Sequence, residues 1–485
     1  MMADLLNEIS NFIGGVLVPK TDTIMVVLLI ITGLFYSFKT KFVQFRMLRF
    51  VFKILTEKQD GKTKEHISPF QALMISTASR VGIGNIAGIS VALTLGGAGA
   101  LFWMWLMAFF GGASAFAEST LAQVYKSKDK NGFKGGPAYY IQKALNLKWL
   151  GCLFAFILII TYAYGFNGLQ SQTMTSAFQI YYNMFDQNGV KFADSDWPLI
   201  IGAILAIFSS FMFFSHHTTI GKVSSVIVPF MALAYVGLSV IAIFMNFDKI
   251  PQVFDMIFKS AFDFKAIFGG FAGSVLVIGI KRGLFSNEAG MGSAPNAAAA
   301  AFTTHPAKQG IIQSFAVFID VIICTSSGFL VLFSMAYLNN IGADGKPILV
   351  ALPLVQEAMK EYYGDFGIHF TTIAIVLFAI TSLIGNYYYA QANVRFLTNS
   401  NFAMNVFKLS AVFMIFIGAQ MNLTLAWNLA DLTMAFMATI NIVSILLLSA
   451  IVKKVLDDFN EQKSLGKDPV FSAKKLNIKN AECWD

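Results

Sequence analysis

The chain has 485 residues, of which 56% are hydrophobic and 13% charged, with a mean hydropathy of +0.64. A soluble domain is about half apolar and about a quarter charged, so this composition excludes an ordinary soluble protein and indicates a membrane protein. The formal net charge of +8 does not indicate nucleic-acid binding, because basic residues of membrane proteins collect in cytoplasmic loops. The three cysteines are far apart and match neither a metal-binding spacing nor a disulfide framework.

The apolar segments predict an all-α polytopic membrane protein with about eleven transmembrane helices. Each segment is near or above the roughly 20 residues that cross a bilayer. The predicted spans are residues 22–38, 70–95, 98–124, 150–182, 197–214, 218–246, 266–301, 310–338, 366–392, 403–419 and 426–452. The first lacks the basic flank of a signal peptide and is expected to be retained. Residues 350–362 are too short and too charged to span, and we expect a helix within a loop.

Lysine and arginine predict the orientation in the cell membrane. They concentrate in the loop 39–65, in the loop 126–148 and in the tail from residue 453. Because such loops are usually cytoplasmic, we expect the N-terminus outside and the C-terminus inside. The tail, mixed in charge, is expected to be cytoplasmic and partly disordered.

Two glycine-interrupted stretches resemble each other at an offset of 202 residues: RVGIGNIAG at 80–88 and RGLFSNEAG at 282–290. Each lies near the start of a block of five predicted spans, 70–246 and 266–452. Five is odd, so the second block must enter the membrane from the opposite side, which predicts an inverted repeat. The expected organisation is then 1–69 (N-terminal helix and basic loop), 70–246, an external loop 247–265, 266–452, and a cytoplasmic tail 453–485.

A broken helix in lipid needs a physical reason, because each backbone group that loses its partner costs several kcal/mol there. A carboxylate can bind freed N–H groups and a cation freed carbonyls, and paired breaks in an inverted repeat indicate a transporter's central site. Glycine allows the unusual backbone angles. The alternative is that these glycines only permit close helix packing. Two breaks at matching places favour the binding site.

Four further stretches resemble the alanine or glycine:cation symporter family, also called sodium:alanine symporters. They are STASRVGIGNIAG (76–88), GGAGALFWMWLMAFFG (96–111), GGPAYYI (135–141) and KRGLFSNEAGMGSAPNAAA (281–299). The resemblance implies a leucine-transporter-type fold of ten core helices in two inverted halves, with one extra N-terminal helix and with the first and sixth core helices broken. It implies symport of sodium with a small neutral amino acid, alanine or glycine, by alternating access. It implies no enzyme activity, no prosthetic group and no obligatory protein partner.

A local resemblance within this fold assigns residues to ligands: VGIGN (81–85) is similar to the unwound first core helix of the neurotransmitter:sodium symporters. In it, N–H groups around Ile83 and Gly84 hold the substrate carboxylate. The implied substrate-binding residues are Ser79, Gly82, Ile83, Gly84, Asn85, Gln170, Gly283, Phe285, Ser286 and Asn287. The implied sodium ligands are Ala78, Val81, Phe378, Thr381 and Ser382. A second sodium site would use Asn85, but its other partners are not identified, and we expect one sodium ion per substrate.

Some of these residues have a second interpretation. A Thr–Ser pair in a membrane helix usually bonds its own backbone, and Gln170 could join helices or accept from the substrate ammonium. A phenyl group at Phe285 would leave room only for a small side chain.

Five charged residues in or beside the spans are predicted to form gating or structural ion pairs: Arg80, Glu118, Arg282, Glu288 and Asp320. Ionisable groups in a membrane are usually functional, and Glu118 or Asp320 could instead relay protons. An ion channel is less consistent, since filters are usually repeated around a symmetric pore. The nearest alternative is a proton-coupled or sodium-independent amino-acid transporter, in which a charged residue would replace the Thr381 and Ser382 hydroxyls.

Overall fold

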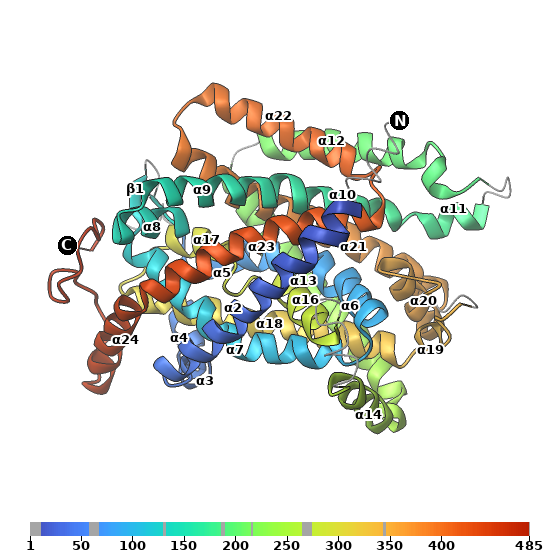
Figure 1. Ribbon diagram of the computed structural model, residues 1–485, viewed down its shortest axis with the longest axis horizontal. Coiled ribbons are helices and arrows are strands. Elements are labelled where there is room, and N and C mark those ends of the chain that lie inside the picture. Colours follow the sequence, from blue (N-terminus) through green and yellow to red (C-terminus); the bar gives the residue numbers. More distant parts are fainter. Residues whose placement is uncertain are drawn as a thin grey trace.

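The computed structural model describes residues 11–57, 67–129, 132–185, 190–214, 217–263, 274–342 and 346–484. In this part the chain is a helical bundle with one small hairpin (Figure 1). By length and hydropathy, eight helices or continuous helical runs can each cross a membrane. They are Ile13–Lys39 (η1 and α2), Ala100–Val124 (α7), Lys148–Phe185 (α9, η5, α10 and α11), Trp197–Phe214 (α12), Pro306–Leu332 (α18), Asp365–Leu397 (α21), Asn401–Gly418 (α22) and Leu423–Leu447 (α23).

Two bent pairs raise the number of spans to at most ten. In the first, α5 (Pro69–Arg80) and the run Gly84–Gly96, made of η4 (Gly84–Gly88) and α6 (Ile89–Gly96), meet at 50°. In the second, the helical segments Pro229–Met245 and Phe247–Ala261 meet at 78°. Eleven predicted spans therefore exceed what the described residues contain. The difference lies in the predicted span 266–301, of which 266–273 lie outside the described residues.

The rest of that span is two short helices, α16 (Val275–Asn287) and α17 (Ala294–Ala300). Of the remaining described elements, α13, η7 and α14 contain the second bent pair, and the others are short or lie between the spans. The remaining elements are α3 (Val43–Arg46), η2 (Leu48–Phe50), α4 (Val51–Leu55), β1 (Ser127–Asp129), β2 (Gly132–Lys134), α8 (Pro137–Leu145), η6 (Phe192–Asp194), α13 (His217–Met245), η7 (Phe247–Lys249), α14 (Ile250–Ala261), α19 (Met335–Leu338), α20 (Leu352–Tyr363) and α24 (Ser449–Ser464). Strands β1 and β2 are antiparallel, with Ser127 opposite Lys134.

Local sequence explains where the central helices begin. Ser68 caps α5: its side chain accepts from the N–H of Gln71, and the Gln71 side chain accepts in return from the N–H of Ser68. This reciprocal box satisfies two donors that a helix start leaves free. Pro69 at the first helical position needs no N–H partner. The sequence therefore starts the helix sharply before it is interrupted at Val81.

Helices α7 and α18 form the centre of the bundle, and small residues let them approach closely. A Cβ atom built on Gly310 of α18 would lie 2.8 Å from the Phe116 carbonyl oxygen of α7. On the neighbouring turns of α7, a Cβ on Gly111 would lie 3.0 Å from Ala289, and one on Gly112 would lie 3.2 Å from Ser314. Such small-residue contacts are typical of helix packing in membranes. They place α7 against α18 and against the break that follows α16.

Three segments differ from the sequence-based expectations or add to them. Residues 247–265, expected to be a loop, contain α14, whose apolar residues pack on α7. The helix expected within 350–362 is present as α20. The tail is not disordered in its described part: after α24 it forms turns in which Phe471 and Ala481 are buried. It lies beside β1 and α8 (Figure 1), where the Asn480 amide donates to the Lys143 carbonyl at 2.8 Å.

Candidate functional site

The first broken helix unwinds at Val81. There α5 ends, and Val81 has an extended backbone (φ −78°, ψ 96°) before the helix resumes at Gly84. The N–H of Gly82 is freed by the break and donates to the side-chain oxygen of Asn85 at 2.9 Å. A Cβ on Gly82 would lie 2.2 Å from the Ser382 hydroxyl. Only glycine can therefore occupy this position while Ser382 keeps its rotamer.

The second break lies a little later than the sequence suggested. Phe285, Ser286 and Asn287 were expected at the break, but they form the last turn of α16. The unwound residues are 288–293, where Glu288, Gly290 and Gly292 have positive φ. Asn287 accepts from the N–H of Ala289 at 2.9 Å. Its side chain therefore stabilises the end of the helix.

The first broken helix meets the last turn of α16 at Gly84. A Cβ on Gly84 would lie 3.1 Å from the ring of Phe285 and 3.3 Å from the Cα of Ser286. The Phe285 ring also packs edge-on against Phe166 of η5 and Trp427 of α23, at centroid distances of 4.9 and 5.0 Å. Aromatic groups from three other elements thus close one side of the unwound segment.

Two of the predicted sodium ligands, Ala78 of α5 and Ser382 of α21, lie close together. The Ser382 hydroxyl lies 3.3 Å from the Ala78 carbonyl oxygen, and the Thr381 hydroxyl bonds the Phe378 carbonyl of its own helix at 2.9 Å. All five predicted ligands, including Val81, are buried. Hard cations prefer clustered oxygen ligands at about 2.3–2.6 Å, and two oxygens 3.3 Å apart can bind one ion. The Ala78 and Ser382 oxygens therefore suit a sodium ion, whereas the Thr381 hydroxyl is bonded within its own helix.

Asn85 and Ser286 connect the two breaks through Asp320 of α18. Both donate to the same carboxylate oxygen, Ser286 at 2.9 Å. The other oxygen lies 3.6 Å from the thiol of Cys324. Among the described residues, no lysine, arginine or histidine forms an ion pair with Asp320. The carboxylate is thus buried with neutral donors only, and the expected ion pair is not formed.

The other predicted carboxylates also bind neutral groups. Glu288 accepts from the hydroxyls of Ser79 and Ser293, both at 2.8 Å. Glu118 accepts from the N–H groups of Gly290 (3.3 Å) and Gly292 (3.1 Å) and from the Asn441 amide (2.8 Å). Neutral donors are near because both breaks expose backbone N–H groups and serines there. Glu118 therefore holds the unwound segment after α16.

Arg80 forms no ion pair among the described residues, in contrast to the expectation of a partner in Glu288. Its only bond there joins Nη1 to the Gln313 carbonyl at 3.5 Å, and its Nε and Nη2 have no partner. Glu288 instead accepts a hydrogen bond from Ser79, the residue before Arg80 in α5.

Arg282 does form an ion pair, with an acid that the sequence analysis missed. Its guanidinium binds Asp431 of α23 through two bonds of 2.9 and 2.7 Å. Lys281 lies 2.6 Å from Asp22 of α2 and 3.0 Å from Asp431. The sequence did contain a signal for this cluster. Asp22 lies in the apolar first helix and Asp431 in the last span, and acids within membrane spans are rare.

Gln170 lies beside the first break. Its amide nitrogen is 3.7 Å from a Cβ built on Gly82, and its side-chain oxygen is buried without a hydrogen-bond partner among the described residues. Gly283 lies elsewhere: its Cβ position faces Met104 and Met107 of α7 at 3.4 Å. Gly283 therefore serves helix packing, whereas Gln170 has an acceptor available for a ligand.

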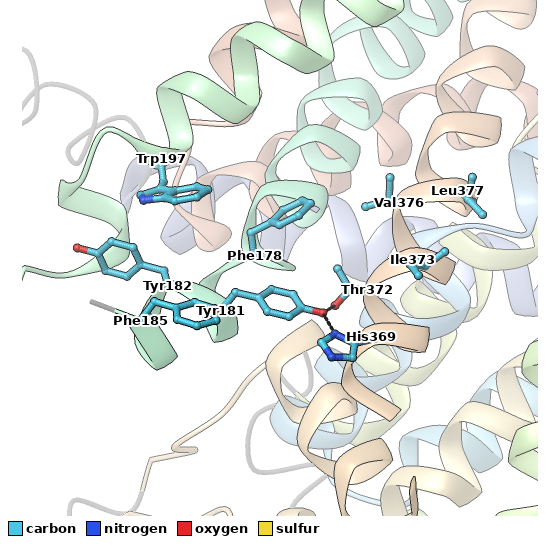
Figure 2. Close-up of a pocket in the computed structure, with 10 residues that line it drawn as sticks. All are labelled: Phe178, Tyr181, Tyr182, Phe185, Trp197, His369, Thr372, Ile373, Val376 and Leu377. Carbon is cyan, nitrogen blue, oxygen red and sulfur yellow. Dashed lines mark hydrogen bonds between the residues drawn. The ribbon is translucent and has the colours of Figure 1, made fainter. Parts of the chain in front are cut away.

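A cavity of about 810 Å³ lies away from this site (Figure 2). It is lined by residues of α10 to α12 and of α21, among them Phe178, Trp197 and Leu377. His369 and Tyr181 are its main polar groups, and they hydrogen-bond each other at 2.9 Å. None of the predicted site residues lines it. The predicted residues are instead all buried in the centre of the bundle.

A multi-pass membrane bundle whose two broken helices meet at a buried polar site defines a secondary amino-acid transporter of the leucine-transporter type rather than an enzyme. Residues 3–473 match the sodium:alanine symporter family, and the chain belongs to that family.

Two relatives with transporter names and one solved structure are similar to this chain. The "Probable sodium/glutamine symporter GlnT" of Bacillus subtilis is 43% identical over all of this chain and 97% of its own length. The "Sodium/proton-dependent alanine carrier protein" of Bacillus sp. (strain PS3) is 35% identical over 88% of this chain and 95% of its own. Among structures, MhsT in complex with L-phenylalanine aligns with a TM-score of 0.51 at 12% identity, over 80% of this chain and 97% of that one. That likeness concerns the fold alone.

Proposed function

We propose that the protein is a sodium-coupled symporter that imports a small neutral amino acid, alanine or glycine, by alternating access. The observation that supports it most is the contact between the broken α5 and α21, where the Ser382 hydroxyl lies 3.3 Å from the Ala78 carbonyl. Sodium bound there would supply the charge that orders the unwound backbone. Because binding energies are reciprocal, bound sodium then raises substrate affinity and bound substrate raises sodium affinity.

The amino acid would bind between the two breaks. Freed N–H groups near Ile83 and Gly84 would bind its carboxylate, as half-helix N-termini do. The unpartnered oxygen of Gln170 would accept from its ammonium group. Phe285, held against Gly84, would face its side chain. This wall favours alanine or glycine over glutamine, the substrate in one relative's name.

Proton coupling is the second candidate, and Asp320 favours it. This carboxylate is buried among neutral donors at the junction of both breaks, and a buried carboxylate without a positive partner tends to take up a proton or a cation. One relative's name includes both sodium and proton. In this alternative, protonation of Asp320 would replace sodium as the coupling event.

We place the protein in the cell membrane, with its N-terminus outside and its C-terminus in the cytoplasm. The basic loops 39–65 and 126–148 and the tail support this orientation. Substrate and ion would therefore be released on the side where the tail lies.

The test is uptake of labelled alanine into proteoliposomes under a sodium gradient, a potassium gradient or a pH gradient. We expect sodium-driven accumulation, and about a tenfold higher half-saturating sodium concentration in Thr381→Ala, which corresponds to about 1.4 kcal/mol. Thr371→Ala is the matched control, because Thr371 is also a buried threonine of α21 that bonds its own helix, at Gly367. It should leave sodium dependence unchanged.

The outcomes separate the two candidates. Accumulation driven by a pH gradient without sodium, and lost in Asp320→Asn, would refute sodium coupling and support the proton candidate. An equal loss of sodium affinity in Thr381→Ala and Thr371→Ala would refute the ion site.

A further inference from the structure

Four charged side chains form one buried cluster between α2, α16 and α23: Asp22, Lys281, Arg282 and Asp431. Each side chain is at most 10% exposed. One oxygen of Asp431 is shared, because both Lys281 (3.0 Å) and Arg282 (2.7 Å) approach it. The second acid, Asp22, comes from the helix that precedes the core. We call this group the charge clamp. With two acids and two bases, its formal charges cancel.

The clamp holds Trp427. The guanidinium carbon of Arg282 lies 3.9 Å from the centre of a Trp427 ring, a cation–π contact. Asp431 lies one turn after Trp427 in α23. The Asp431 carboxylate and the Trp427 indole therefore both contact the Arg282 guanidinium. Trp427 also approaches the first broken helix, 3.5 Å from a Cβ built on Gly88. The indole is therefore fixed between both broken helices.

Trp427 in turn fixes Phe285, the side chain that faces the proposed substrate. The Phe285 ring packs against Gly84, Phe166 and Trp427. A longer substrate side chain would need the phenyl ring to move toward Trp427. That movement would displace the Trp427 indole from the Arg282 guanidinium, and the contacts of the charge clamp oppose this displacement.

We propose that the charge clamp sets the longest substrate side chain that the site admits, and that α2 takes part in substrate selection through Asp22. The inference rests on the proposed function. Without Asp22, Lys281 depends on the shared oxygen of Asp431, which weakens the hold of Asp431 on Arg282. The indole then loosens, and Phe285 can move aside for a longer substrate. Asp22 is a positioning residue, since it acts on the substrate only through other side chains.

If the charge clamp only stabilises the fold, a different result is expected. Loss of one charge from a buried cluster leaves the opposite charge uncompensated and destabilises the protein. Fewer active carriers would then lower the maximal rate, but each would keep its selectivity. The ratio of affinities for a short and a long amino acid separates the two roles.

The experiment measures, in proteoliposomes, the KM for labelled alanine and the inhibition constant for unlabelled glutamine. For Asp22→Asn we expect the ratio of the glutamine constant to the alanine KM to fall about tenfold, the size of effect that methylene groups have on discrimination. The double variant Asp22→Asn with Lys281→Met restores neutrality and should recover the original ratio. Asp255→Asn, which removes an acid from the exposed pair with Lys259, should not change it.

An unchanged ratio in Asp22→Asn, with only a lower maximal rate, would overturn the inference. If Asp22→Asn does not reach the membrane, Trp427→Phe tests the same step, because the smaller ring should also lower the ratio. An unchanged ratio in Trp427→Phe would equally overturn the inference. A wild type that takes up no small amino acid would instead overturn the proposed function, and this inference with it.

Discussion

Replacing Glu118 by glutamine tests how the unwound segment after α16 is held. One carboxylate oxygen accepts from the N–H of Gly290, and the other accepts from the N–H of Gly292 and from the Asn441 amide. Glutamine keeps one acceptor oxygen and turns the other into an NH₂ donor. Whichever way the amide is oriented, at least one buried donor then faces another donor.

The structure sets the size of the effect. With the NH₂ group toward Gly290, one bond is lost; with it toward Gly292 and Asn441, two are lost. The first orientation is cheaper, and an orphaned buried donor costs about 1–3 kcal/mol. We therefore expect Glu118→Gln to lower the free energy of unfolding by about that amount, measured by denaturant titration in detergent. Glu482→Gln, at an exposed pair with Lys143, is the control. Equal stability of Glu118→Gln and wild type would refute the reasoning, because it would mean that the segment does not need two acceptors.

Two further predictions follow from other contacts. Gly84→Ala places a methyl group 3.1 Å from Phe285 and 3.3 Å from the Ser286 backbone. Because such overpacking costs about 1–3 kcal/mol, the KM for alanine should rise at least about fivefold. An unchanged KM would contradict the contact of the two breaks. Lys126 lies under Phe133 and Trp484 of the tail, and burial lowers its pKa from 10.5 to about 7. Because the unfolded chain then binds more protons between those values, the stability of the packed tail should rise as the pH rises from about 7 to 10.5. Hydrogen exchange of the tail amides measures this, and Lys126→Met should remove the pH dependence.

The position of the first break could be predicted because its signal is local. Gly82 and Gly84 lie at the break, Asn85 binds the N–H of Gly82 three residues away, and the glycine spacing is visible in the sequence. The meeting of the two breaks followed from pairing them across two blocks. The exact limits of the second break did not, because Phe285 to Asn287 continue the helix until Glu288 adopts a left-handed backbone.

Long-range partners could not be predicted in the same way. Nothing local to Arg282 specifies Asp431, which lies 149 residues away, and Glu118 was assigned a charged partner although backbone N–H groups satisfy it. The ordered tail was missed for a related reason. Its few apolar residues lack helical periodicity, and they are buried only because Phe471 packs on His305 and on Trp484. Such contacts depend on the finished fold.

The pairing of Asp22 with Lys281 has a consequence for biosynthesis. The two residues are separated by 259 positions, so at about 5–20 residues per second the ribosome needs about 13–50 s between them. During that time the first helix has left the ribosome, while its acid still lacks the base that neutralises it. Asp22 is the tenth of the 27 residues in the run Ile13–Lys39, and an unpaired carboxylate there weakens insertion into lipid. The contact of the first helix with α16 can form only after residue 281 has been synthesised, so this docking is a late step of assembly.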